Sequence, residues 1–265
     1  MIELSNLQTI RMESEGPVTR VTLNRPEVHN AFNLTMVKEL IAAFRALARD
    51  ASTRVVVLTG EGSSFCAGAD LNWMREIISY SFEENLEESN LISDLMEAIN
   101  FCPKATIARV QGATLGGGTG LAATCDLVIA ADVAFFSLSE VRIGLVPACI
   151  SPYIIARVGP MKARECFVTG ERIPAHDAAR IGLATECVPL EQLDGRVNER
   201  VSQILRNGPT AITRAKELVA RVPTMPISVA KRYTAEVIAA QRIDAEGQEG
   251  IDAFLNRRKP KWVVS

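Results

Sequence analysis

Residues 112–120 read GATLGGGTG and follow a β-like run, residues 106–110. A second glycine-bearing loop, residues 62–71 (GSSFCAGADL), follows the apolar run 54–59, and both loops lead into segments that can be helical. Glycine lets a backbone approach a ligand closely, and the first turn of a helix presents N–H groups without intrahelical partners. The two loops can therefore point two N–H donors at one oxygen, which is the requirement for stabilising an enolate or another oxyanion.

A single carboxylate, Glu140, lies nearby in residues 137–144 (SLSEVRIG). Beside such an oxygen, a carboxylate can take up and return a proton. Two plainer interpretations stay open. The glycines 116–118 could serve only tight helix–sheet packing, and Glu140 could be a helix N-terminal acid that follows Ser137 and Ser139.

Composition narrows the class of protein. The chain has 265 residues and a net charge of −2, so one domain with a helical extension is plausible and nucleic acid is not an expected partner. The most apolar stretch, residues 127–138, contains Asp132 and is too short to span a bilayer. Residues 1–6 lack the features of a secretory signal. We expect a cytoplasmic protein with no membrane partner.

Cysteines and histidines give no sign of a metal centre. The six cysteines lie far apart, which is typical of reduced residues in a cytosolic protein. His29 and His176 are the only histidines, and neither sits in a ligand cluster, so neither a metal site nor a histidine-activated nucleophile is predicted.

Strand-like and helix-like segments alternate along the first half of the chain, which predicts an α/β fold with crossover units. From about Ile150 onward strands nearly vanish and helices dominate. The expected strands are residues 18–23, 54–59, 106–110, 126–131 and 134–138, and the expected helices include 84–100 and 35–49, the latter capped by Thr35.

Residues 118–123 (GTGLAA) also fit the dinucleotide-binding pattern, with Glu140 beyond them as the acidic residue. This pattern would favour an NAD-dependent dehydrogenase. Its glycines should follow directly on a strand, however, and residues 111–115 intervene. We therefore rank this interpretation below an oxyanion site.

The two loops and Glu140 resemble the enoyl-CoA hydratase/isomerase (crotonase) superfamily, and the resemblance covers nearly the whole chain. It implies a crotonase-type ββα spiral core in residues 1–200 and a C-terminal helical trimerisation region in residues 201–265, in a homotrimer or dimer of trimers. The further matching segments are residues 24–31 (NRPEVHNA), 125–126 (CD), 144–147 (GLVP), 169–170 (TG), 178–183 (AARIGL) and 253–260 (AFLNRRKP).

By the same resemblance, the N–H groups of Ala69 and Gly117 would hold the thioester oxygen of an acyl-CoA, and Glu140 would transfer protons. Coenzyme A is then part of the substrate, and no separate cofactor is implied. The acyl-CoA would run past Val28, His29, Ala67, Gly68, Asp70, Leu71 and Asn72, with Arg25, Arg257, Arg258 and Lys259 as candidates for its phosphates.

One position departs from the family. Its hydratases use two glutamates, and the first of them is replaced here by Gly120. We expect the space at Gly120 to hold ordered water or a branch of the acyl chain. A 3,2-enoyl-CoA isomerase needs only one base, so isomerisation by Glu140 stays open, as does a non-catalytic acyl-CoA-binding role.

Residues 136–153 (FSLSEVRIGLVPACISPY) are similar to the branch that hydrates 3-methylglutaconyl-CoA and isohexenylglutaconyl-CoA in leucine and acyclic-terpene breakdown. Members of that branch carry Ile-Ser-Pro where the broader family has Gly-Gly-Thr. We therefore favour addition of water to the 2,3-double bond of a branched or glutaconyl-type acyl-CoA. Arg142 and Arg75 are the candidates for binding the substrate's second carboxylate.

Overall fold

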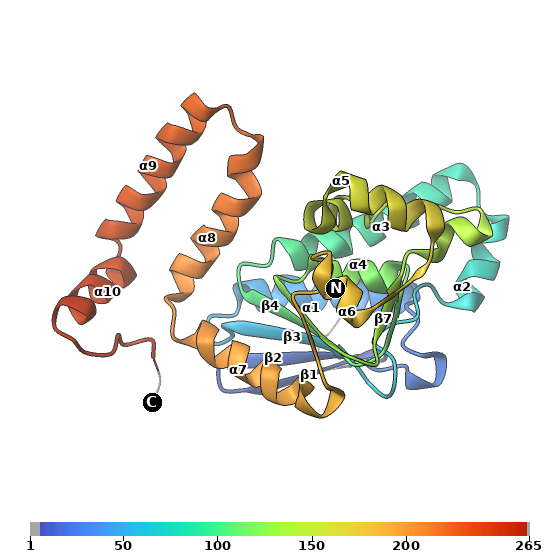
Figure 1. Cartoon of the computed structure of the whole chain (residues 1–265), viewed down its shortest axis with the longest axis horizontal. Coiled ribbons are helices and arrows are strands. Elements are labelled where there is room, and N and C mark those ends of the chain that lie inside the picture. The colour runs from blue at the N-terminus through green and yellow to red at the C-terminus, as the bar shows by residue number, and fades with distance from the viewer. Residues whose placement is uncertain (1–5, 264–265) are drawn as a thin grey trace.

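The computed structural model describes residues 6–263, which form a sheet-and-helix core and a group of C-terminal helices that stands apart from it (Figure 1). The larger sheet has the strand order β1-β2-β3-β4-β6-β9; β1 and β2 pair antiparallel and the other pairs are parallel. Its strands are β1 (Ile10–Glu15), β2 (Val18–Leu23), β3 (Val55–Gly60), β4 (Ala105–Val110), β6 (Leu127–Ala131) and β9 (Glu186–Val188).

A smaller sheet has the order β5-β7-β8, in which β5 and β7 are parallel and β7 and β8 antiparallel. Its strands are β5 (Ala113–Leu115), β7 (Phe135–Ser137) and β8 (Arg172–Pro174). The α-helices are α1 (Leu34–Arg49), α2 (Leu71–Glu76), α3 (Phe82–Asn100), α4 (Gly117–Thr124), α5 (Ser151–Thr169), α6 (Ala175–Arg180), α7 (Leu193–Leu205), α8 (Pro209–Arg221), α9 (Ile227–Ile243) and α10 (Ala245–Leu255). The 3-10 helices are η1 (Pro26–Val28), η2 (Ile77–Ser79), η3 (Ser139–Ile143), η4 (Leu190–Gln192) and η5 (Val222–Thr224).

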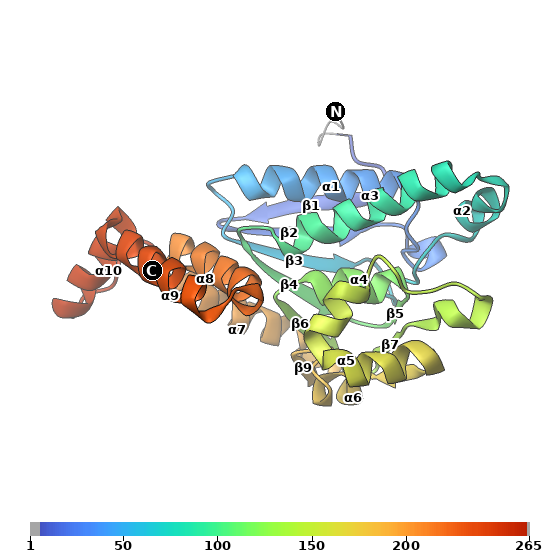
Figure 2. The ribbon, with the colours of Figure 1, turned by 90° about the horizontal axis from the view of Figure 1, so that it is seen from above.

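Strand β3 shows why its sequence is apolar throughout. Successive side chains of a strand point to opposite faces, and all six residues of β3 are buried. Val56 and Leu58 join the main core with α1 and α3, whereas Val55 and Val57 pack in a second cluster with α7. Helices α1 and α3 lie along the same side of the sheet (Figure 2). Covered on both faces, the sheet fixes where the loops after its strands end up.

The predicted α/β class with a crotonase-type core is confirmed, and β2 coincides with the expected strand. The predicted N-cap was wrong. Helix α1 begins at Leu34, and the side chain of Asn33 accepts the Met36 N–H at 3.0 Å. Strand β1 was not predicted because only Ile10 of its six residues is buried and the pattern reads as polar.

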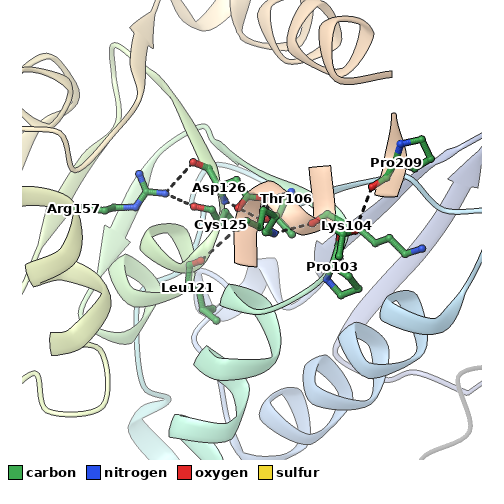
Figure 3. Close-up of polar contacts among 10 residues, drawn as sticks. Pro103, Lys104, Thr106, Leu121, Cys125, Asp126, Arg157 and Pro209 are labelled. Carbon is green, nitrogen blue, oxygen red and sulfur yellow. Dashed lines mark hydrogen bonds and ion pairs between the residues drawn. The ribbon is translucent and has the colours of Figure 1, made fainter. Parts of the chain in front are cut away.

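The C-terminal helices are joined to the core by α8. Lys216 donates to a carboxylate oxygen of Asp126 at 2.7 Å, and this oxygen also accepts the N–H and the hydroxyl of Thr106 at 2.8 and 3.0 Å. Figure 3 shows Asp126 and Thr106 together, with Arg157 of α5 reaching the neighbouring carbonyl of Cys125. Across residues 6–263 no helix has both the length and the apolar character needed to cross a bilayer.

Candidate active site

The two glycine loops lie against each other, although 40 residues separate them in the chain. Cys66 forms an isolated parallel bridge with Thr114, and the N–H of Leu115 donates to the carbonyl of Cys66 at 2.9 Å. A Cβ added at Gly68 would lie 3.0 Å from the carbonyl oxygen of Leu115. This approach was not visible in the sequence, because it depends on β5, which lies inside the second loop.

Each loop presents one N–H group without an internal partner. Gly117 is the first residue of α4, so its N–H has no acceptor within the helix. Ala69 is exposed, and the peptide groups on both sides of it are already bonded to Phe32. Over residues 6–263, the N–H groups of Ala69 and Gly117 donate to no protein acceptor. Both remain available for a ligand oxygen.

Phe32 contacts both halves of this arrangement. Its N–H donates to the carbonyl of Gly68 at 2.8 Å, and its carbonyl accepts the N–H of Asp70 at 3.0 Å, which clamps Ala69 between them. Its ring covers Gly117, where an added Cβ would lie 2.3 Å from Cζ of Phe32. Sequence analysis missed Phe32, which directly follows the matching segment 24–31.

Glu140 lies beside the start of α4. It sits in the first turn of η3, and its Oε1 is 3.0 Å from the position that a Cβ on Gly116 would take. Its Oε2 is buried and has no hydrogen-bond partner among the described residues. Burial raises the pKa of Glu140 and its own backbone N–H offsets this only in part. A carboxyl group of this kind can both accept and return a proton.

The space expected at Gly120 does not exist. A Cβ added there would lie 2.1 Å from Cγ2 of Ile150 and 3.4 Å from Cε of Met96. Gly120 and both of these side chains are buried. The expectation of water or an acyl branch at Gly120 was therefore wrong, because the side chain of Ile150 occupies that position.

The sequence profile of enoyl-CoA hydratase/isomerase proteins matches residues 13–264. The chain belongs to the enoyl-CoA hydratase/isomerase family. A mitochondrial enoyl-CoA hydratase domain-containing protein 3 from Xenopus laevis is 31% identical over 256 residues, covering 96% of this chain and 86% of that protein.

Solved structures of the family agree with this assignment. An enoyl-CoA hydratase from Shewanella pealeana has a TM-score of 0.94 at 35% identity, covering 97% of each chain. Pseudomonas aeruginosa AtuE has a TM-score of 0.94 at 35% identity, covering 97% of this chain and 100% of that one. The dinucleotide-binding interpretation is wrong, since the glycines it needs face Cys66 and Ile150 rather than open space.

The fold of this enoyl-CoA hydratase/isomerase family member also brings together the segments expected to bind coenzyme A. The carbonyl of His29 accepts the N–H of Ala67 at 3.0 Å, and its Nδ1 lies 3.1 Å from the hydroxyl of Ser64. These contacts join η1 to the first loop. His29, which follows η1, is exposed and Val28 is half-buried. Leu71 and Asn72, at the start of α2 directly after this loop, are exposed as well.

Asp70 and Arg25 pair with each other and hold the backbone of the first loop. Asp70 is buried, caps α2 by accepting the N–H of Asn72 at 2.7 Å, and pairs with Arg25 at 2.8 Å. Burial alone would raise the pKa of Asp70, but the Asn72 N–H and the Arg25 guanidinium outweigh it and hold this pKa below its usual range. Arg25 also donates to the carbonyl of Ala31 at 2.6 Å, so its guanidinium already has two protein partners, and its contact with a phosphate stays a prediction.

The C-terminal basic residues are not brought to this site. The segment after α10, which carries Arg257 and Lys259, lies at the opposite end of the molecule from α2 (Figures 1 and 2). Arg258 is paired with Glu249 and Asp252, and its hydrogen bonds lower the pKa of Glu249 to about 2. Their contact with the phosphates of coenzyme A stays a prediction.

No group of three or more potential metal ligands occurs among residues 6–263. The six cysteines are free, and burial raises the pKa of Cys66 and of Cys125 to about 12. Such thiols remain protonated at neutral pH and are poor nucleophiles.

Proposed function

We propose that this chain adds water across the 2,3-double bond of an acyl-CoA, with Glu140 as its acid–base group. The observation that carries the proposal is the placement of Glu140: its carboxylate lies beside Gly116, and the unbonded N–H of Gly117 follows at the next residue. A thioester oxygen bound at Gly117 would thus lie close to the one group that can move a proton.

The proposed reaction has two steps. Glu140 removes a proton from water while the oxygen bonds to C3, and the π electrons move onto the thioester to give an enolate. The N–H groups of Ala69 and Gly117 stabilise the enolate oxygen, each contributing roughly 2.7–4 kcal/mol. Glu140 then gives its proton to C2. The sum is one water added and the carboxylate regenerated.

We further propose a branched or glutaconyl-type acyl group. This rests on the local sequence around Ile150 and on two arginines without carboxylate partners. Neither Arg75 nor Arg142 forms an ion pair within residues 6–263, and both are exposed. Either could bind a second carboxylate of the substrate, although Arg75 also donates to the amide oxygen of Asn72 at 2.6 Å.

One observation favours 3,2-enoyl-CoA isomerisation as the second candidate. Ile150 fills the position of the second acid, so a reaction that needs a single base suits this site. In that reaction Glu140 would remove a proton from C2 of the 3-enoyl thioester and return it at C4, through a dienolate whose oxygen the N–H groups of Ala69 and Gly117 would hold.

A panel of CoA thioesters separates the two functions: crotonyl, 3-methylcrotonyl, 3-methylglutaconyl and 3-hexenoyl, each followed by mass spectrometry. We expect the product to gain the mass of one water, most rapidly with 3-methylglutaconyl-CoA. An unchanged mass with a shifted double bond would support isomerisation instead. Unaltered binding with no product from any thioester would leave the chain a non-catalytic acyl-CoA-binding protein.

For assembly and location we propose a cytoplasmic homotrimer or dimer of trimers, built through residues 201–265, with residues 1–200 as the catalytic core. Support comes from large apolar side chains that the single chain leaves exposed on α9 and α10. They are Ile227 (86%), Val229 (52%), Ile238 (49%), Ile243 (82%), Ile251 (47%), Phe254 (83%) and Leu255 (71%). Exposed apolar surface of this extent is typical of an interface. A neighbouring subunit could also bring Lys259 to the coenzyme A phosphates.

A further inference from the structure

Gly120 and Ile150 form a matched pair across the contact between α4 and α5. A side chain on Gly120 would enter the van der Waals volume of Ile150, since its Cβ would lie 2.1 Å from Cγ2 and 2.8 Å from Cβ of Ile150. Ile150 is only 3% exposed and Met96, the next neighbour, is 0% exposed. Ile150 and Met96 thus occupy the space that a side chain at residue 120 would need.

This closed position lies one helical turn from the proposed base. The N–H of Gly120 donates to the carbonyl of Gly116 at 3.2 Å, and Gly116 is the residue that Glu140 covers. One turn of α-helix rises about 5.4 Å. The first turn of α4 therefore contacts the carboxylate of Glu140 at Gly116 and the buried side chain of Ile150 at Gly120.

We infer that Ile150 is a specificity-determining residue that restricts this site to one carboxylate. The inference rests on the proposed function and deepens it. With the Ile150 side chain in place, a second acid has no room at residue 120, so every proton that moves must pass through Glu140. Ile150 thus slows hydration of simple enoyl-CoAs relative to proton shuttling between C2 and C4.

The packing half of the inference is tested by thermal unfolding of a double-mutant cycle. Alanine is otherwise favoured over glycine inside a helix. Gly120→Ala should lower the Tm of the wild-type chain strongly, because its Cβ would meet both Cγ2 and Cβ of Ile150, and lower the Tm of the Ile150→Ala chain much less, because only the 2.8 Å contact with Cβ remains there. Ile154→Ala is the matched control, because Ile154 is buried on the next turn of α5. In that background Gly120→Ala should lower the Tm as much as in the wild-type chain. An equal drop in all three backgrounds would overturn the inference.

The chemical half uses Gly120→Glu on the Ile150→Ala background. We expect at least about 10-fold faster crotonyl-CoA hydration than in Ile150→Ala alone, because a second acid–base group is worth about 10²- to 10⁴-fold when well placed. The ratio of hydration to isomerisation should rise with it. In the wild-type and Ile154→Ala backgrounds, Gly120→Glu should abolish activity.

A folded Gly120→Glu, Ile150→Ala chain that hydrates no faster than Ile150→Ala would refute the assignment. If that chain does not fold, Gly120→Asp supplies a shorter carboxylate for the same comparison. Should the wild-type protein convert no thioester, the proposed function fails, whereas the size of the Gly120→Ala effect on the Tm, with and without the Ile150 side chain, still decides whether Ile150 closes this position.

Discussion

Glu140 combines two properties at the residue scale that a surface carboxylate lacks. One oxygen is buried without a partner, and the carboxyl group faces the backbone of a glycine rather than a cation. Because the carboxyl group is buried, its pKa is raised. A buried carboxylate without a partner lowers the stability of the fold, which is a common trade for activity at catalytic sites.

Glu140→Gln keeps the shape of the side chain and removes the proton acceptor. Turnover should fall roughly 10²- to 10⁴-fold while acyl-CoA binding, measured by calorimetry, is retained. Glu171→Gln, an exposed glutamate on the turn before β8, is the control and should leave turnover unchanged. Wild-type-like turnover in Glu140→Gln would show that another group moves the proton.

The raised pKa of Glu140 also fixes two pH dependences. The rate should climb as pH rises through this pKa, at a pH above the ordinary glutamate value of 4.5, because the carboxylate is the active form. A carboxyl whose pKa is raised in the folded chain favours folding below its unfolded pKa, and this contribution is lost as pH rises through the folded pKa. Glu140→Gln should therefore raise the Tm at pH 7 but not at pH 4. A higher Tm at pH 4 alone would contradict this sign.

Phe32 should act as a positioning residue for both oxyanion donors. Phe32→Leu should lower kcat about 10- to 100-fold with a smaller change in KM, since donors misplaced by a fraction of an ångström lose much of their effect. Phe44→Leu is the matched control: Phe44 is also buried, but it lies on α1 away from the loops. Both variants should lose similar stability, about 1 kcal/mol. Equal loss of kcat in both would assign Phe32 to packing alone.

At the scale of elements, the position of α8 against the core depends on a small cluster of polar residues. Lys216 donates to Asp126 and to the carbonyl of Lys104 at 2.7 and 2.8 Å, and Thr213 donates to the carbonyl of Pro103 at 2.8 Å. Helix α8 is thus held by hydrogen bonds at the starts of β4 and β6, and its Ile212 also packs against the second apolar cluster. Figure 3 shows Pro103, Lys104 and Asp126, which accept these hydrogen bonds.

Lys216→Met should cost about 1–3 kcal/mol of unfolding free energy, because the partly buried Asp126 carboxylate loses its cation. Hydrogen exchange should show the loss concentrated in α8. Lys231→Met on the exposed face of α9 is the comparison and should leave stability unchanged. Uniform destabilisation of the core strands would contradict a local role for the cluster.

The shape of the whole molecule sets the active-site loops at one end and the C-terminal helices at the other (Figures 1 and 2). A single chain in water would expose the apolar side chains of α9 and α10, which is unfavourable by about 25 cal/mol for each Å². Association through these helices removes that cost.

Phe254→Glu places a charge on one of the most exposed of these side chains. We expect light scattering with size exclusion to give a trimer or hexamer for the wild-type protein and a smaller species for this variant. Val133→Glu, at an exposed turn after β6, should leave the assembly intact. A monomeric wild-type protein would remove the support for the trimerisation region.

Local rules were enough for a large part of this description. The uninterrupted apolar run of β3 indicated a strand buried on both faces, and the glycines before α4 indicated an exposed helix start, because both follow from backbone geometry and alternation. The sequence by itself thereby determined the fold class, the two loops and the lone carboxylate at Glu140.

Only the tertiary structure decided which side chains fill the space around these elements. Ile150 closes the position over Gly120, Phe32 covers Gly117, and Arg25 pairs with Asp70. Each contact joins segments distant in the chain, so it depends on how α1, α4 and α5 pack and on which partner a charge finds when buried. Periodicity and local spacing carry no record of those distances.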